Sequence, residues 1–249
     1  MKKHILLALV FWVNNIKAEE IYATFTVHAM KEANLAFNYS GIVKEINVDI
    51  MSVVKQGDIL ATLISDDLIA SNNASKVILK YAKLDYERYK ELLKKKLIDK
   101  AQLDKYALAY ESIKAQIRLE ETIHAKTILR APFDGVITRR MIESGDVVSG
   151  QMIKTAYNIQ SEHERILFVE CDQKYSNDVK IGDAFIYNIE GSDRQYQGTV
   201  FRIFPTTNTN NRKIAIQVIA MDLKVGLFGE GKIITSDREN KTTVKATQE

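Results

Sequence analysis

The hydrophobic pattern divides the chain into three regions. Residues 21–64 carry short apolar runs separated by polar and turn-forming residues, which is typical of strands. Residues 66–127 contain no Gly and no Pro and are rich in Ala, Leu, Lys and Glu, which favours helix. Strand patterning returns after Thr127, with glycines spaced as turns between apolar runs. The pattern predicts a mainly β chain interrupted by a long helical segment.

Two apolar seams indicate that the helical segment is a pair of helices. The first seam is Ala70, Ala74, Val77, Tyr81 and Leu84, and the second is Leu103, Tyr106, Tyr110, Ile113 and Ile117. Alternating spacings of three and four residues are those of a coiled coil, whose seam packs against a partner helix. We therefore expect an antiparallel coiled-coil hairpin over residues 66–126, with both seams buried between the helices.

The break between the helices is predicted at residues 94–99. Asp99 and Gln102 have the spacing of a capping box, in which the first side chain accepts a free backbone amide of the second helix. Ile98 and Leu103 flank this cap as a hydrophobic staple. The lysines at 94–96 suit the carboxyl end of the first helix, where cations interact favourably with the helix dipole.

An internal repeat flanks the hairpin. The first copy reads Ser-Gly-Ile-Val at 40–43 and Gly-Asp-Ile-Leu at 57–60; the second reads Asp-Gly-Val-Ile at 134–137 and Gly-Asp-Val-Val at 145–148. Its structural glycines are Gly41, Gly57, Gly135 and Gly145. Each copy alone has too few strands to bury a sheet face. We therefore expect one β domain, formed by residues 33–64 and 127–155, into which the hairpin is inserted.

The remaining sequence predicts a second β unit and a tail. Apolar runs between residues 157 and 235 are joined by turns rich in Gly, Asn and Ser, which indicates further strands. Residues 236–249 are polar and without periodicity, so we expect them to be disordered.

The first eighteen residues are predicted to be a cleaved signal peptide. Lys2 and Lys3 precede an apolar run at 5–13, and Ala18 supplies a small residue before the cleavage point. This run is too short for a bilayer core, which needs about 20 residues; the alternative is a buried N-terminal strand. With Lys17, the two leading lysines account for the formal charge of +3, so the mature chain is near neutral. The charge therefore gives no indication of nucleic-acid binding.

The two half-motifs and the hairpin between them resemble the membrane fusion proteins, the HlyD-like periplasmic adaptors of Gram-negative tripartite efflux pumps. The resemblance covers residues 33–235 and is most specific at Arg-Ala-Pro-Phe-Asp-Gly-Val-Ile, 130–137. It implies a split lipoyl domain, also called a barrel-sandwich hybrid, an α-hairpin and a β-barrel domain at 157–235.

The same resemblance implies that the chain is a non-enzymatic periplasmic protein, and it implies which partners the chain has. Such adaptors bridge an inner-membrane transporter and a TolC-type outer-membrane channel, and they self-associate as trimers or hexamers. The resemblance favours a transporter of the resistance–nodulation–division type, with an ABC exporter or a heavy-metal pump as alternatives. It implies association with the inner membrane through the transporter.

The hairpin tip carries a further match. Many relatives have an Arg, a Leu four residues later and a Ser seven residues beyond, which engage the channel. Arg88, Leu92 and Asp99 stand at these spacings here. Asp99 in place of Ser retains a helix cap but adds a charge. The alternative is that Arg88 and Asp99 are an exposed helix face and a cap without a partner.

No catalytic, cofactor or metal site is predicted. His28, His124 and His163 are scattered, Cys171 is the only cysteine, and no Gly-rich phosphate loop occurs. His28 with Met30 is an isolated pair, for which packing is the better interpretation. Covalent lipoylation is not expected, because the helices occupy the place of the lipoyl-lysine turn. A second hypothesis remains, an exported metal- or small-ligand-binding protein with the hairpin as a dimerisation device.

Overall fold

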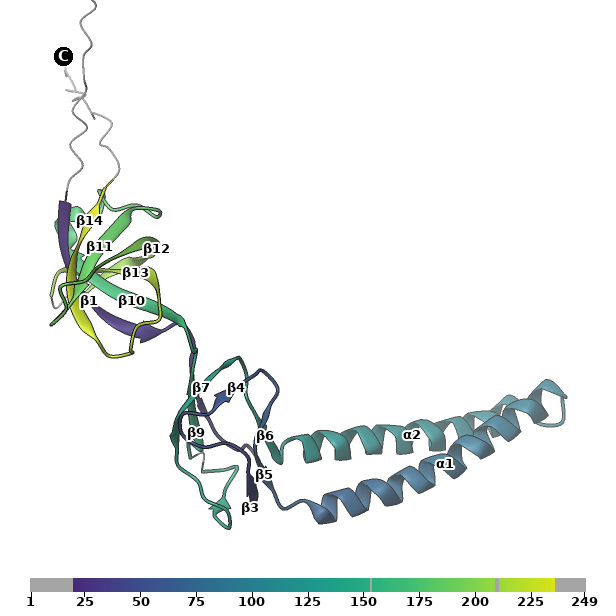
Figure 1. The fold of residues 1–249 in the computed structure, drawn as a ribbon. Helices are drawn as coiled ribbons and strands as arrows, with labels where there is room; N and C mark the ends of the chain where they lie inside the picture. Colours follow the sequence, from purple (N-terminus) through teal and green to yellow (C-terminus); the bar gives the residue numbers. More distant parts are fainter. Residues whose placement is uncertain (1–19, 153, 209–210, 236–249) are drawn as a thin grey trace, which may run out of the picture. The chain divides into compact units, whose positions relative to one another are not determined.

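The computed structural model describes residues 20–152, 154–208 and 211–235 (Figure 1). The predicted signal peptide at 1–18 and the predicted tail at 236–249 lie outside these residues. The chain forms two compact units, one made of Met1–Met30 with His163–Glu249 and the other of Lys31–Glu162. The expected fold class, mainly β with an inserted helical hairpin, is confirmed.

The first unit is a closed barrel of six strands in the order β1-β10-β13-β12-β11-β14. Its elements are β1 (Glu20–Ala29), β10 (Glu164–Asp172), a short 3-10 helix η1 (Gln173–Tyr175), β11 (Ala184–Ile189), β12 (Gln195–Asn208), β13 (Lys213–Met221) and β14 (Phe228–Ile234). Alternate residues of each strand face inward, as in other small barrels. Phe25, Phe185 and Tyr187 are buried there and pack edge-on or stacked, with ring centroids 5.0–5.8 Å apart.

The barrel corrects the expected domain range of 157–235 in two ways. Strand β1 lies outside that range but closes the barrel between β10 and β14, with Thr24 opposite both Glu170 and Glu230. Conversely, β9 (Tyr157–Gln160) lies inside the range but belongs to the second unit. Strand pairing between distant segments leaves no local pattern, so the sequence could not reveal either assignment.

The second unit contains two four-stranded sheets, in the orders β2-β9-β7-β4 and β6-β5-β3-β8. Besides β9, its strands are β2 (Glu32–Leu35), β3 (Gly41–Ile46), β4 (Val53–Val54), β5 (Ile59–Leu63), β6 (Ile128–Arg130), β7 (Gly135–Arg140) and β8 (Val147–Val148). Strands before the hairpin pair with strands after it: β4 with β7, β5 with β6, and β3 with β8. Neither half is a domain by itself, as the repeat predicts.

The repeat glycines act in two different ways. Gly57 and Gly145 both have φ +92° with open space around them, so each lets the chain turn where a side chain would strain the backbone. In both turns the following aspartate accepts a backbone amide at 2.8 Å. Gly135 is needed for packing, because a Cβ there would lie 2.3 Å from the carbonyl oxygen of Gln160. At Gly41 a Cβ would lie 3.2 Å from Leu63 Cδ1.

The inserted hairpin consists of α1 (Asp66–Lys94) and α2 (Lys100–Ala125). Neither helix is long and apolar enough to cross a membrane, which holds for every helix that the structure describes. The seam predicted on α2 faces α1, and its residue Ile117 is buried.

The seam predicted on α1 is wrong. Val77, Tyr81 and Leu84 are 57%, 61% and 47% exposed, so they face solvent. Most buried and half-buried positions of α1 lie two residues away, at Leu68, Asn72, Ser75, Leu79, Ala82, Tyr86, Tyr89 and Leu93. Polar residues occupy this seam because they bond to α2, so apolar periodicity alone selected the wrong face.

Candidate functional site

A polar layer joins the two helices near the base of the hairpin. The Glu120 carboxylate of α2 accepts hydrogen bonds from Ser75 Oγ at 2.9 Å and from Gln116 Nε2 at 3.1 Å, with longer contacts to Ser71 and Asn72. The bond from Gln116 is the main cause that lowers the pKa of Glu120; partial burial opposes it, and the bonds from α1 assist it. A polar group in a coiled-coil seam fixes the register, because a slipped pairing leaves it without partners.

An aromatic layer joins the helices nearer the tip. Tyr89 and Tyr106 stack with ring centroids 3.7 Å apart, and their hydroxyl groups hydrogen-bond at 2.9 Å. This bond raises the pKa of Tyr89. Tyr86 and Tyr110 stack one turn further from the tip, at 5.6 Å. Together with the polar layer, these contacts hold the arms in one register along most of their length.

Helix α1 ends in a Schellman motif. Lys96 adopts φ +58°, and its N–H donates to the carbonyl of Leu93 at 2.9 Å. The N–H of Leu97 donates to the carbonyl of Leu92 at 3.0 Å. This pair of bonds satisfies the last carbonyl groups of the helix and reverses the chain. A left-handed conformation is unusual for Lys and is normally taken by Gly.

Helix α2 begins with the predicted cap. Asp99 Oδ1 accepts the backbone N–H of Gln102 at 2.8 Å, which confirms the N-cap. Ile98 and Leu103 on either side are half-buried, as a hydrophobic staple requires. The tip is therefore an ordered turn closed by a cap on each helix.

The structure brings two of the three predicted tip residues to the turn. Leu92 is half-buried in the last turn of α1, and Asp99 is the exposed N-cap of α2. Arg88 lies one helical turn before Leu92, where its guanidinium is exposed and pairs with Asp85 at 3.1 Å.

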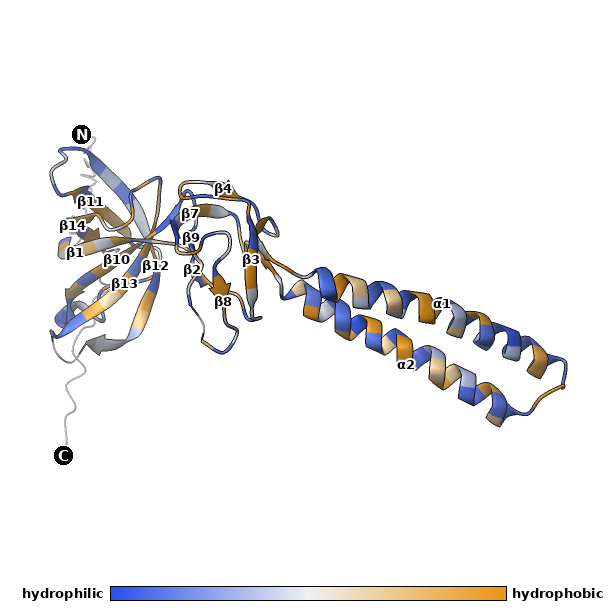
Figure 2. Cartoon of the chain, turned by 90° about the horizontal axis from the view of Figure 1, so that it is seen from below, coloured by the Kyte–Doolittle hydropathy of each residue, from blue (hydrophilic) through white to orange (hydrophobic). Residues whose placement is uncertain are grey.

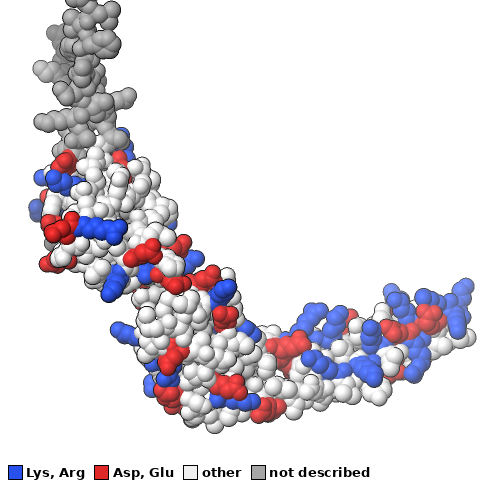
Figure 3. Space-filling model, viewed as in Figure 1, with Lys and Arg blue, Asp and Glu red and all other residues white. Residues whose placement is uncertain are grey.

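Leu97 is a surface residue of the turn that the sequence pattern did not predict. It is 67% exposed in the turn itself, more accessible than Leu92. Lysines at 94, 95, 96 and 100 surround it in sequence, and Figure 3 shows basic side chains gathered over the outer part of the hairpin. An apolar residue in a short polar turn was the signal that could have identified it.

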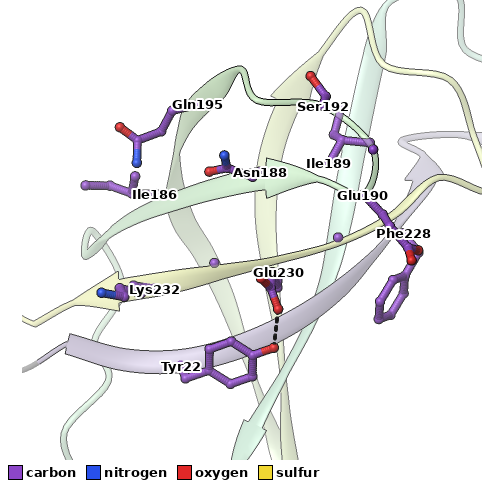
Figure 4. A pocket seen from close by; sticks show the side chains of 13 residues that line it. Tyr22, Ile186, Asn188, Ile189, Glu190, Ser192, Gln195, Phe228, Glu230 and Lys232 are labelled. Carbon is purple, nitrogen blue, oxygen red and sulfur yellow. Dashed lines mark hydrogen bonds between the residues drawn. The ribbon is translucent and has the colours of Figure 1, made fainter.

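A hollow of about 560 Å³ on the barrel surface offers no comparable site (Figure 4). Two of its polar side chains are engaged by neighbouring strands: Tyr22 donates to Glu230, which raises the pKa of Tyr22, and Lys232 donates to Glu20 at 2.6 Å. Among the described residues, no three His, Cys, Asp or Glu side chains are grouped so that they could hold a metal ion. Burial raises the pKa of the Cys171 thiol to about 11, which leaves it unreactive at neutral pH.

Comparison with known families decides which class of protein this geometry belongs to. The family model described as CzcB-like, barrel-sandwich hybrid domain, matches residues 31–159, just over half of the chain. The chain belongs to this family. The match spans both half-motifs and the hairpin between them, so it confirms the resemblance to the membrane fusion proteins.

A curated relative extends the similarity beyond that domain. The cobalt-zinc-cadmium resistance protein CzcB of Cupriavidus metallidurans is 25% identical over an alignment 237 residues long, which covers 86% of this chain and 45% of the relative. The chain therefore spans about half the length of the curated relatives that it matches.

Solved structures show that the fold is shared. A MacA–MexA chimera that contains the Pseudomonas aeruginosa MexA α-hairpin domain has a TM-score of 0.81 at 20% identity, covering 89% of this chain and 81% of the other. MacA from Actinobacillus actinomycetemcomitans has a TM-score of 0.71 at 18% identity, covering 88% and 79%.

Proposed function

We propose that the protein is a periplasmic adaptor of a tripartite efflux system, which bridges an inner-membrane transporter and a TolC-type outer-membrane channel. One observation carries this proposal: a helical hairpin of 29- and 26-residue arms is inserted between the two halves of a barrel-sandwich domain. At about 1.5 Å per residue, each arm is about 40 Å long. Such an arm suits a protein that spans a distance between partners.

The proposed mechanism is architectural. The polar and aromatic layers hold the hairpin in one register, and the two caps fix its turn, so the tip presents a pre-organised surface. Leu97 and Leu92 supply apolar area at the turn, while Arg88 supplies directional hydrogen bonds to carbonyl or carboxylate groups. Each contact is modest, and several adaptor copies around one channel would raise the overall affinity through avidity.

A heavy-metal pump is the form of this system that the relatives favour. The matching proteins are named a cobalt-zinc-cadmium resistance protein and a cation efflux system protein. We propose on this basis that the transporter is of the resistance–nodulation–division type and exports divalent cations. The test compares the tolerance of cells with and without the gene to cobalt, zinc, cadmium and an organic antibiotic. Loss of tolerance to the metals alone distinguishes cation export from drug export.

Substitutions at the tip test the docking role. Leu92→Asp or Arg88→Glu is expected to abolish co-purification with the channel and to abolish efflux, because each removes a contact that only the partner completes. The unfolding temperature should change little, since Arg88 is exposed and Leu92 is only half-buried in the last turn of α1.

Lys80→Glu is the matched control, because it reverses an exposed charge on the same helix two turns nearer the base. It should leave channel binding unchanged. Normal efflux and channel binding by both tip variants would show that the tip is not the docking site.

The exported ligand-binding hypothesis makes a different prediction. It requires a stoichiometric ligand on the purified chain, which elemental analysis and native mass spectrometry would detect. A tightly held metal would favour that hypothesis over a purely architectural role.

A further inference from the structure

The positive charge of the hairpin is concentrated at its tip. Between residues 88 and 105, seven Lys or Arg stand against three Asp or Glu, whereas the rest of the hairpin, 66–87 and 106–126, has six against seven. Figure 3 shows basic side chains over the outer part of the hairpin. Because the remainder of the hairpin is nearly balanced in charge, this excess belongs to the tip and not to the helices as a whole.

Two of the tip lysines are explained by the hairpin itself. Lys94 and Lys95 close the last turn of α1, where cations interact favourably with the helix dipole. Lys94 also pairs with Glu91, with 2.6 Å between Nζ and Oε1. These two lysines would therefore suit the end of α1 whether or not the tip had a partner.

Lys96 and Lys100 have no such explanation. Lys96 takes the left-handed conformation, φ +58°, that Gly adopts at lower cost in this kind of cap. Lys100 is the first residue of α2, where the helix dipole favours an acidic residue over a cation. Both side chains are exposed, and neither pairs with an acidic residue within the part of the chain that the structure describes. Residues that local structure disfavours are characteristic of functional sites.

The two lysines flank an exposed apolar residue in an ordered turn. Leu97 directly follows Lys96 and is 67% exposed. Figure 2 shows an apolar stretch in the turn that joins α1 and α2, with polar residues on both sides. An apolar centre with a polar rim is the composition of a protein–protein interface. An anionic polymer would need the lysines but not the leucine, so the observations favour an acidic protein surface as the partner.

We propose that the hairpin turn recognises acidic side chains of its channel, with Lys96 and Lys100 pairing with carboxylates around an apolar contact at Leu97. The inference rests on the proposed adaptor function and deepens it by stating the chemistry of the partner surface. Opposite charges on the two surfaces speed their encounter and disfavour basic partners. The acidic side chain of the turn itself, Asp99, accepts the N–H of Gln102 at 2.8 Å, so it is engaged in the cap of α2.

Carbodiimide crosslinking tests this pairing in cell envelopes that contain the full chain. The reagent joins a lysine amine to a carboxylate as an amide and takes up the water that is lost, so the two groups must be in contact. Mass spectrometry is expected to find Lys96 or Lys100 linked to an Asp or Glu of an outer-membrane channel subunit. Lys80 is the matched control, because it is exposed on α1 nearer the base and should give no link to that subunit.

Lys96→Gly separates recognition from folding. Glycine relaxes the left-handed position, so the unfolding temperature should stay the same or rise. Affinity of the purified full chain for the crosslinked channel subunit should nevertheless fall about tenfold at low salt, the effect of losing one hydrogen bond between charged groups. The difference should shrink at high salt, which screens exposed charges. Lys80→Gln removes a charge elsewhere on the hairpin and should bind like the unsubstituted chain.

Two results would overturn the inference. One is that Lys96 and Lys100 link to the carboxylates of peptidoglycan and to no protein, which would identify an anionic polymer as the ligand. The other is that neither lysine links to any carboxylate while a photoreactive group at Leu97 still traps the channel; the adaptor function would then stand without charge recognition. Links to an acidic protein that is not an outer-membrane channel would support recognition of acidic surfaces and count against the adaptor function.

Discussion

At the residue scale, the repeat was predictable because two of its glycines are required by the conformation of the turns in which they lie. Gly57 and Gly145 share φ +92°, so a Gly-Asp dipeptide between apolar runs correctly indicated two matching turns. The packing role of Gly135 was not predictable, since the Gln160 carbonyl that lies against it comes from a strand further along the chain. The backbone conformation of a turn is determined by residues close in sequence. The close approach of two strands depends on the tertiary fold.

Because the two glycines are required for different reasons, replacing each with alanine should lower the free energy of unfolding by different amounts. Gly145→Ala should destabilise the chain by about 1 kcal/mol, because it strains only the turn. Gly135→Ala should cost more, about 2–3 kcal/mol, because the new Cβ would lie 2.3 Å from a backbone oxygen that cannot rotate away. Urea unfolding of both variants measures the difference. Equal costs at the two positions would contradict the packing role of Gly135.

At the element scale, the hairpin was predictable in extent but not in the face that α1 buries. The cap at Asp99 and the seam through Ile117 follow directly from sequence. On α1, the exposed stripe is more apolar than the true seam, which contains Asn72 and Ser75. Their burial depends on Glu120, a residue of the other helix, so apolar periodicity within α1 alone could not locate it.

The Glu120 layer predicts a pH-dependent hairpin. Its hydrogen bonds lower the pKa of Glu120 below the ordinary value of 4.5, so the folded state favours the carboxylate. The resulting stability is present above pH 4.5 and is lost as the pH falls through the lowered pKa. Circular dichroism melts from pH 7 to pH 3 should show this loss, and Glu120→Gln should reduce the pH dependence.

A matched control for this layer is Glu121→Gln, which removes a neighbouring exposed carboxylate with one surface ion pair. Its melting temperature should follow that of the unsubstituted chain at every pH. Identical pH profiles for Glu120→Gln and the unsubstituted chain would show that the layer contributes nothing to register or stability.

At the scale of the whole molecule, the order of domains was predictable and their composition was not. The repeat and the hairpin led to the family that the comparisons show. Strand β1 was missed as part of the barrel, because its partners β10 and β14 lie far along the chain. The barrel unit combines a segment from the start of the described chain with one from its end. Its boundaries therefore could not be predicted from a continuous stretch of sequence.

The most direct test of the adaptor role is photo-crosslinking in living cells from Leu97, the exposed apolar residue of the hairpin turn. A photoreactive amino acid at this position is predicted to trap one dominant partner, which mass spectrometry should identify as an outer-membrane channel subunit. The same amino acid at Ile69, which is 44% exposed in the first turn of α1, should not trap it. A Leu97 variant that traps no channel, or an Ile69 variant that traps it equally well, would show that the hairpin turn does not dock on a channel.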